Sequence, residues 1–122
     1  MIKIETSKAP AAIGPYSQGL VANGFVFTSG QIAIDPDSGN IAQGIHAQAE
    51  RCCKNVQAIL EAAGSNMAKV VKTTCYLSDM NDFTDFNSVY AQYFTGNPAR
   101  SCVAVKQLPK NVLCEIEAIA LI

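Results

Sequence analysis

The spacing of apolar residues between Ile45 and Ala63 constrains the fold more than any other feature of this chain. Apolar side chains recur there every three or four positions, which places them on one face of an α-helix. Gly64 follows directly and suits the left-handed conformation that ends many helices. The segment therefore predicts an amphipathic helix whose apolar face consists of Ile45, Ala49, Cys52, Val56, Ile59, Leu60 and Ala63.

A second helix is predicted from about Asp82 to Phe94, with Gly96 and Pro98 ending it. Its aromatic side chains also recur at three- and four-residue spacings. We interpret this stripe as core rather than as a cofactor site, because a helix lying on a sheet needs an apolar face. The stripe comprises Phe83, Phe86, Val89, Tyr90, Tyr93 and Phe94.

Strands are predicted before, between and after the helices. Asn23-Gly24 lies between two β-prone runs, and this dipeptide favours the type I′ turn of a β-hairpin. Residues 31–34 are expected to extend the second strand of that hairpin. The predicted strands are 19–22, 25–28, 70–77, 99–105 and 113–121.

The resulting element order is β-β-α-β-α-β-β, in a single domain spanning residues 1–122. We expect an α+β fold, with a mixed sheet that carries both helices on one face. The other face is then open. Because 49% of the residues are apolar, other copies of the chain are expected to pack there.

Charge and cysteine content exclude several classes of function. Nine basic residues balance ten acidic ones with no basic cluster, so we expect no nucleic-acid partner. The five cysteines show no zinc spacing and have only one histidine to assist them, which argues against a metal site. Their odd number and the absence of a long apolar run favour a soluble, cytoplasmic protein without membrane contact.

Arg100 is the main candidate for ligand binding. Side chains alternate along a strand, so Arg100 and Cys102 share one face, while Ser101, Val103 and Val105 share the other. We take the valines to mark the core, which predicts that Arg100 points away from the helices. Its planar guanidinium suits a carboxylate ligand. A structural ion pair with an acidic neighbour explains the residue equally well.

Glu115 and Glu117 share one face of an otherwise apolar final strand. At least one is expected to be partly buried, which raises the pKa of a carboxyl group and suits proton transfer at neutral pH. A nearby arginine would act in the opposite direction. The alternative, which we prefer for Glu117, is an exposed edge-strand carboxylate that discourages aggregation.

Two turn segments are weaker candidates. Tyr16 lies in a Gly-Pro-Tyr-Ser-Gln run, and Ser29-Gly30 ends a strand where backbone N–H groups could bind a carboxylate. Ordinary turn chemistry explains both segments as well. His46 has no evident nucleophilic partner and is expected to be structural or exposed.

Six short segments, in this order and spacing, resemble the Rid/YjgF family over nearly the whole chain. The resemblance implies a chorismate-mutase-like α+β fold and homotrimers that bind ligands in three clefts between subunits. The segments are Gly14-Pro-Tyr-Ser-Gln18, Thr28-Ser-Gly-Gln31, Val71-Lys-Thr-Thr74, Pro98-Ala-Arg-Ser-Cys-Val103, Leu108-Pro-Lys110 and Glu115-Ile-Glu-Ala118.

The same resemblance implies an activity. Archetypal members of the family are 2-iminobutanoate/2-iminopropanoate deaminases that need no cofactor and release 2-keto acids and ammonia. By motif, Arg100 would hold the substrate carboxylate and Glu115 would position or activate water. Tyr16 and Ser29-Gly30 would close the cleft from a neighbouring subunit, and Cys102 would line it mainly with its backbone.

Three other functions stay open at this point. A non-catalytic module could use the same arginine to bind 2-keto acids for regulation. Family labels also include ribonuclease and translation inhibitor, although RNA contact would need a basic patch. A chaperone-like trimer would make no use of Arg100. Ala104 and Cys114 depart from residues usual in the family, which leaves the substrate side-chain preference undetermined.

Overall fold

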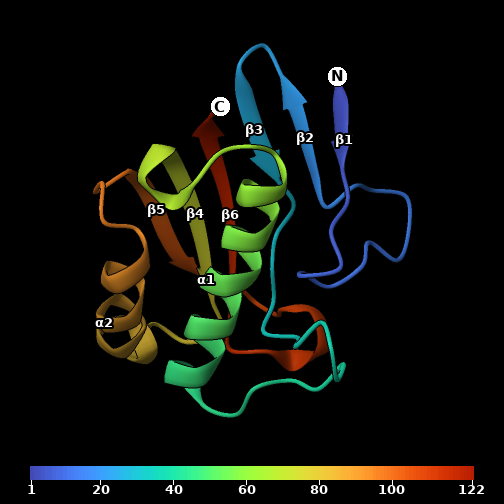
Figure 1. Cartoon of the computed structure of the whole chain (residues 1–122). Helices are drawn as coiled ribbons and strands as arrows, with labels where there is room; N and C mark the ends of the chain where they lie inside the picture. Colours follow the sequence, from blue (N-terminus) through green and yellow to red (C-terminus); the bar gives the residue numbers. More distant parts are fainter.

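A computed structural model describes all 122 residues. It contains a six-stranded sheet and two α-helices, together with three short 3-10 helices (Figure 1). The strands are β1 (Ile2–Ile4), β2 (Gly19–Ala22), β3 (Phe25–Thr28), β4 (Val70–Leu77), β5 (Ala99–Ala104) and β6 (Cys114–Leu121), and the helices are α1 (Ile45–Ala62) and α2 (Phe83–Tyr93).

The sheet is mixed and has the order β1-β2-β3-β6-β4-β5. Only β4 and β5 pair in parallel, with α2 as the crossover between them, and all other pairs are antiparallel. Both helices lie on one face of the sheet, which confirms the predicted α+β class (Figure 1). The predicted order lacked β1, which is only three residues long and too short to show a period.

The hairpin at Asn23-Gly24 is confirmed. Asn23 has φ 53° and Gly24 has φ 81°, as a turn with two left-handed residues requires. The predicted extension of β3 through residues 31–34 is wrong, because only isolated bridges form there, Gln31 with Ile116 and Ile34 with Ile41. The buried Asn55 side chain on α1 holds this segment instead, since its amide donates to the carbonyls of residues 32 and 34.

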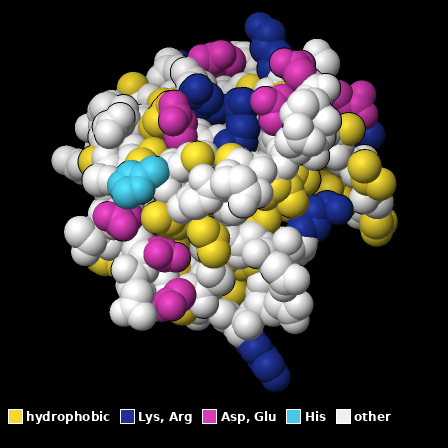
Figure 2. All heavy atoms as spheres, turned by 90° about the horizontal axis from the view of Figure 1, so that it is seen from below, with side chains coloured by type: hydrophobic (Ala, Val, Ile, Leu, Met, Phe, Trp, Pro, Cys, Tyr) yellow, Lys and Arg dark blue, Asp and Glu magenta, His cyan; other side chains and the backbone are white.

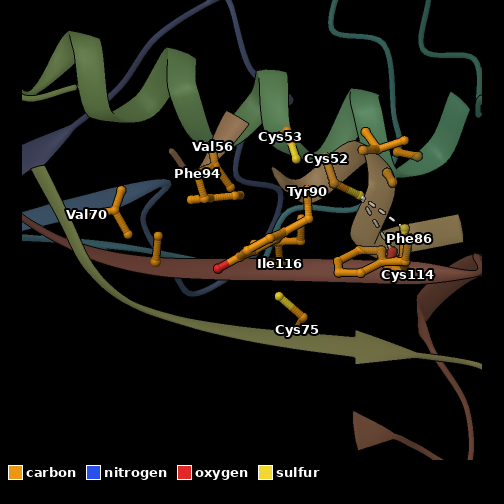
Figure 3. Packing of buried hydrophobic residues seen from close by; sticks show 14 of the residues in the cluster. Cys52, Cys53, Val56, Val70, Cys75, Phe86, Tyr90, Phe94, Cys114 and Ile116 are labelled. Atoms are coloured by element: carbon orange, nitrogen blue, oxygen red, sulfur yellow. Dashed lines mark hydrogen bonds between the residues drawn. The ribbon is translucent and has the colours of Figure 1, made fainter. Parts of the chain in front are cut away.

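The main core lies between the helices and the sheet (Figure 3). From α1 it receives the predicted apolar stripe, including Cys52, Val56 and Leu60, all fully buried. From α2 it receives Phe86 and Tyr90. The aromatic stripe of α2 therefore packs as core, as the spacing predicted, although Tyr90 also has a second contact described below.

Strand β6 lies in the middle of the sheet, between β3 and β4. Its alternating residues Cys114, Ile116, Ala118 and Ala120 are buried beneath the helices. Glu117 is consequently not on an edge strand, which corrects the structural interpretation preferred from the sequence. Neither helix combines the length and the apolar character that a membrane crossing requires.

Candidate functional site

Arg100 points toward the helices, not away from them as the sequence pattern predicted. Its Nη1 donates to Oδ1 of Asn87 on α2 at 2.7 Å. The guanidinium carbon also lies 4.7 Å from the centroid of the Tyr90 ring and 5.5 Å from that of Phe83. The prediction failed because the valine on this strand does not mark the core: Val103 is 47% exposed on the open face.

The positive charge of Arg100 is not neutralised within the chain. No carboxylate lies within 4.0 Å of the guanidinium, since the ion pairs of the structure involve other residues. Its contacts are an amide oxygen and two aromatic faces, which orient a cation without cancelling its charge. The side chain is half-buried and lines a pocket of about 290 Å³ together with Asn87, Asn97 and Pro98. This arrangement suits an anionic ligand.

Cys102 lies on the same face of β5 as Arg100, as predicted. It is half-buried and pairs in register with the buried Cys75 on β4. The pKa of Cys102 is lowered to about 7, mainly by hydrogen bonding with Cys75 and also by the charge of Arg100, against the opposing effect of burial. The same contact and burial raise the pKa of Cys75. All five cysteines are free.

Glu115 occupies the opposite face of the sheet. It is half-buried on β6 and stands opposite Tyr76 in the register with β4. Burial raises the pKa of Glu115, and the neighbouring charge of Glu117 raises it further. Partial burial of one carboxylate was predicted from the strand pattern, and the structure confirms it for Glu115.

The Ser29-Gly30 corner is fixed against β6. The amide of Gln31 donates to the Ile116 carbonyl at 2.8 Å, and the Ile116 amide donates back at 3.1 Å. Ser29 uses both its amide and its hydroxyl within the chain, to the carbonyls of Gln18 and Ser17. The N–H of Gly30 has no partner in the chain. Of the two residues, Gly30 therefore offers the free donor that the sequence suggested.

Tyr16 and Gly30 line one pocket of about 350 Å³, to which Ile13 and Pro109 also contribute. Gly30 and Glu115 line a second pocket of about 340 Å³. Because Gly30 lines both pockets, it connects the pocket that contains Tyr16 with the pocket that contains Glu115. Arg100 and Cys102 belong to neither pocket, because they lie on the helix-covered face of β5.

One chain therefore carries two separate groups of candidate residues. The first consists of a cation with its supports on α2, and the second of a carboxylate, a free amide and an exposed tyrosine on the other side of the sheet. The sequence reasoning missed Asn87, Tyr90 and Phe83 as supports of Arg100. The signal was a polar Asn87 inside the aromatic stripe of α2, which the core interpretation passed over.

No cluster of three or more histidine, cysteine, aspartate or glutamate side chains is arranged to hold a metal ion. His46, the cyan side chain in Figure 2, lies at the surface, with its Nε2 3.8 Å from Oδ1 of Asp85. Acidic and basic side chains are interspersed on the face shown in Figure 2, in keeping with the net charge of −1.

Comparison with known proteins places these features in context. Residues 6–122 match the family model described as Endoribonuclease L-PSP. The 2-iminobutanoate/2-iminopropanoate deaminase of Salmonella typhimurium is 51% identical over 121 residues, which cover 96% of this chain and 94% of that protein. A RutC family protein of Synechocystis is 50% identical over 123 residues, with 98% and 95% covered.

Solved structures agree with these sequence matches. The crystal structure of E. coli TdcF with bound serine superimposes with a TM-score of 0.96 at 46% identity, and covers 100% of this chain and 99% of that chain. The chain is thus similar, over nearly its whole length, to proteins named for an activity and to proteins named only for their family.

Proposed function

The chain belongs to the Endoribonuclease L-PSP family, which is the YjgF/Rid family, and on this premise we propose that it is a 2-iminobutanoate/2-iminopropanoate deaminase. It hydrolyses short 2-imino acids, which interconvert with their enamines, to 2-keto acids and ammonia. The observation that carries the proposal is Arg100, a half-buried guanidinium held by Asn87 and two aromatic rings with no carboxylate beside it.

Arg100 binds the carboxylate of the substrate. A guanidinium has five N–H donors, and Asn87 accepts from one nitrogen, so donors are left for two parallel bonds to a carboxylate. Each charged hydrogen bond contributes about 1.5–3 kcal/mol. The serine that TdcF binds also carries a carboxylate, which supports this class of ligand.

The complete site forms between chains of a homotrimer. Within one chain, Arg100 and Glu115 lie on opposite faces of the sheet, and the substrate is too small to reach both. Arg100 is on β5, an edge strand, where a second chain can approach. In the proposed cleft, Arg100 and Cys102 of one chain face Glu115, Gly30 and Tyr16 of its neighbour.

The chemistry needs no strong nucleophile. The imine carbon is electrophilic, so a held carboxylate and an aligned water bring the reactants together. Water adds to the carbon, a proton passes to the nitrogen, and the resulting carbinolamine expels ammonia as the C=O bond forms. Glu115 takes the proton from water and returns it to the departing amine, a role suited by its raised pKa.

The other residues bind and enclose the substrate. The free N–H of Gly30 donates to it, the Tyr16 ring closes the cleft, and Cys102 lines it with its backbone. The half-buried Cys102 side chain carries no covalent step in this mechanism.

The test is hydrolysis of imines generated in situ by a threonine/serine dehydratase, with ammonia and keto acid both measured. The wild-type chain is expected to accelerate release of both products, and Arg100→Ala to lose this activity while the oligomer persists. Arg51, the only other arginine, gives the matched control Arg51→Ala. Retained activity in Arg100→Ala would remove the carboxylate clamp from the mechanism.

Two other outcomes would identify different functions. Arg100-dependent binding of 2-keto acids without ammonia release would make the chain a binding module. Salt-dependent RNA binding would agree with the endoribonuclease description of the family, but the balanced charge does not favour it.

A further inference from the structure

Tyr76 and Glu117 form a contact that the mechanism above does not use. Tyr76 stands opposite Glu115 in the β4–β6 register. Its hydroxyl nevertheless donates diagonally to Oε1 of Glu117, at 2.8 Å. All three side chains line the pocket of about 340 Å³ that also contains Gly30. The tyrosine therefore fixes one carboxylate beside the other.

We propose that Tyr76 and Glu117 are a positioning pair for Glu115: the tyrosine anchors Glu117 as a fixed negative charge, and that charge strengthens Glu115 as the base that takes the proton from water. Glu117 does not touch the substrate in this arrangement and acts through Glu115. The inference rests on the proposed function, because it assigns the pair to the acid/base step of that reaction.

The geometry supports the unequal roles of the two carboxylates. Residues two apart on a strand point to the same side roughly 7 Å apart, where like charges disfavour ionisation of both groups. Glu117 accepts a hydrogen bond from the phenol of Tyr76, which fixes the position of its carboxylate. Glu115 has no such donor in the chain and is half-buried. Burial first, and the charge of Glu117 second, raise the pKa of Glu115.

Within one chain Glu117 is the dominant charge beside Glu115, whereas in the proposed cleft Arg100 of the neighbouring chain acts in the opposite direction. Only Glu115 and Glu117 are charged among the residues lining this pocket. The 105–109 loop contributes Gln107 and apolar side chains. Lys110 lines the neighbouring pocket. On the helix side of the sheet Glu115 is backed by Cys52, which is uncharged because its pKa is raised well above the ordinary value.

The deciding variant is Glu117→Gln, which keeps the shape of the side chain and removes its charge. The acidic limb of the pH profile of kcat/KM reports ionisation of Glu115 in the free enzyme. This limb is expected to move to lower pH in Glu117→Gln and to stay in place in Glu117→Asp, which retains the charge. Tyr76→Phe frees the charge without removing it, so its limb is expected between those of wild type and Glu117→Gln.

If Tyr76 and Glu117 served folding alone, their variants would lose activity without a shift of the acidic limb. An acidic limb at the same pH in the wild type and all three variants therefore overturns the proposal. Titration of the ¹³C-labelled Glu115 carboxyl by NMR, without substrate, gives a second measurement. The midpoint pH of the Glu115 titration is expected to fall in the same order among the variants as the acidic limbs do. If the wild-type chain releases no ammonia, the proposed function fails, while this titration still decides whether Glu117 controls Glu115.

Discussion

The Glu115 carboxylate lies directly against the α-carbon of Gly30, so that a methyl group built there would overlap Oε1 of Glu115. The backbone of Gly30 does not have a left-handed φ, and its conformation is open to other residues. Glycine is therefore required at this position for space and not for backbone freedom. The contact holds the carboxylate beside the free N–H of Gly30, which is where the proposed mechanism needs both groups.

Gly30→Ala is expected to displace the Glu115 carboxylate and leave the fold intact, because the overlapping atom is the end of a flexible side chain. A misplacement of about 1 Å in such a group costs roughly 100-fold in rate. Ammonia release should fall accordingly, with little change in Tm. Gly96→Ala is the matched control, since its methyl group would meet only an ordinary contact with the Ala68 carbonyl. Equal activity of the two variants would contradict the role of the contact.

Asn87→Asp is expected to weaken substrate binding. It replaces the neutral oxygen that accepts from Arg100 at 2.7 Å with a carboxylate. The new carboxylate neutralises the guanidinium of Arg100 and competes with the substrate carboxylate for its N–H donors. Loss of one charged hydrogen bond, about 1.5–3 kcal/mol, corresponds to a rise in KM of roughly 10- to 100-fold. Asn40→Asp adds the same charge in an exposed turn and should leave KM unchanged. An unchanged KM in Asn87→Asp would show that Arg100 does not hold the substrate.

Glu115→Gln is expected to stabilise the fold in a pH-dependent way. Burial and Glu117 raise the pKa of Glu115, so the folded chain binds this proton more tightly than the unfolded chain does. The stability contributed by the group is fully present below its unfolded pKa and is lost as the pH rises through its folded pKa. The side chain of Glu115→Gln cannot ionise, so the variant does not lose stability in this way. Its Tm should exceed that of the wild type at pH 7–8 and match it below about pH 4.

In the proposed trimer, the guanidinium of a neighbouring Arg100 would oppose this effect. The comparison should therefore be repeated in the Arg100→Ala background, where the difference in Tm at neutral pH is expected to be larger. A Tm difference that does not change with pH would contradict the raised pKa of Glu115.

Local patterns were sufficient to predict most of the elements. The apolar spacing of α1 and the Asn23-Gly24 turn each depend on nearby residues, and the structure confirms both. Residues 31–34 have the composition of a strand, but their backbone is bound by Asn55, a contact made by a residue more than twenty positions away. No local pattern contains that information.

The candidate site shows the same limit. Alternation along β5 correctly placed Arg100 with Cys102 on one face, yet it could not determine which face the helices cover. The assumption that valines mark the core face of β5 failed because the open face of this sheet also carries apolar side chains, such as Phe27 and Val103. Which residues support Arg100 depends on how α2 docks, and this is decided by tertiary packing.

Tyr90 connects the core to Arg100, and its two contacts can be separated by mutation. Its hydroxyl lies 2.7 Å from Oγ1 of the fully buried Thr73, and its ring faces the guanidinium of Arg100. Tyr90→Phe leaves the Thr73 hydroxyl without this partner, so the free energy of unfolding should fall by about 1–3 kcal/mol. The ring contact remains, and KM should stay close to the wild-type value. Tyr90→Leu removes both contacts and should also raise KM.

The double variant Tyr90→Phe with Thr73→Val removes both hydroxyl groups and leaves no unpaired polar atom. Its loss of stability in urea unfolding is expected to be smaller than the sum of the two single losses, because the cost of an unsatisfied buried group is then absent. Strict additivity would show that the hydroxyl pair does not act as a unit. A KM raised equally in Tyr90→Phe and Tyr90→Leu would show that the ring alone does not orient Arg100, and that the hydroxyl bond to Thr73 is what holds it in place.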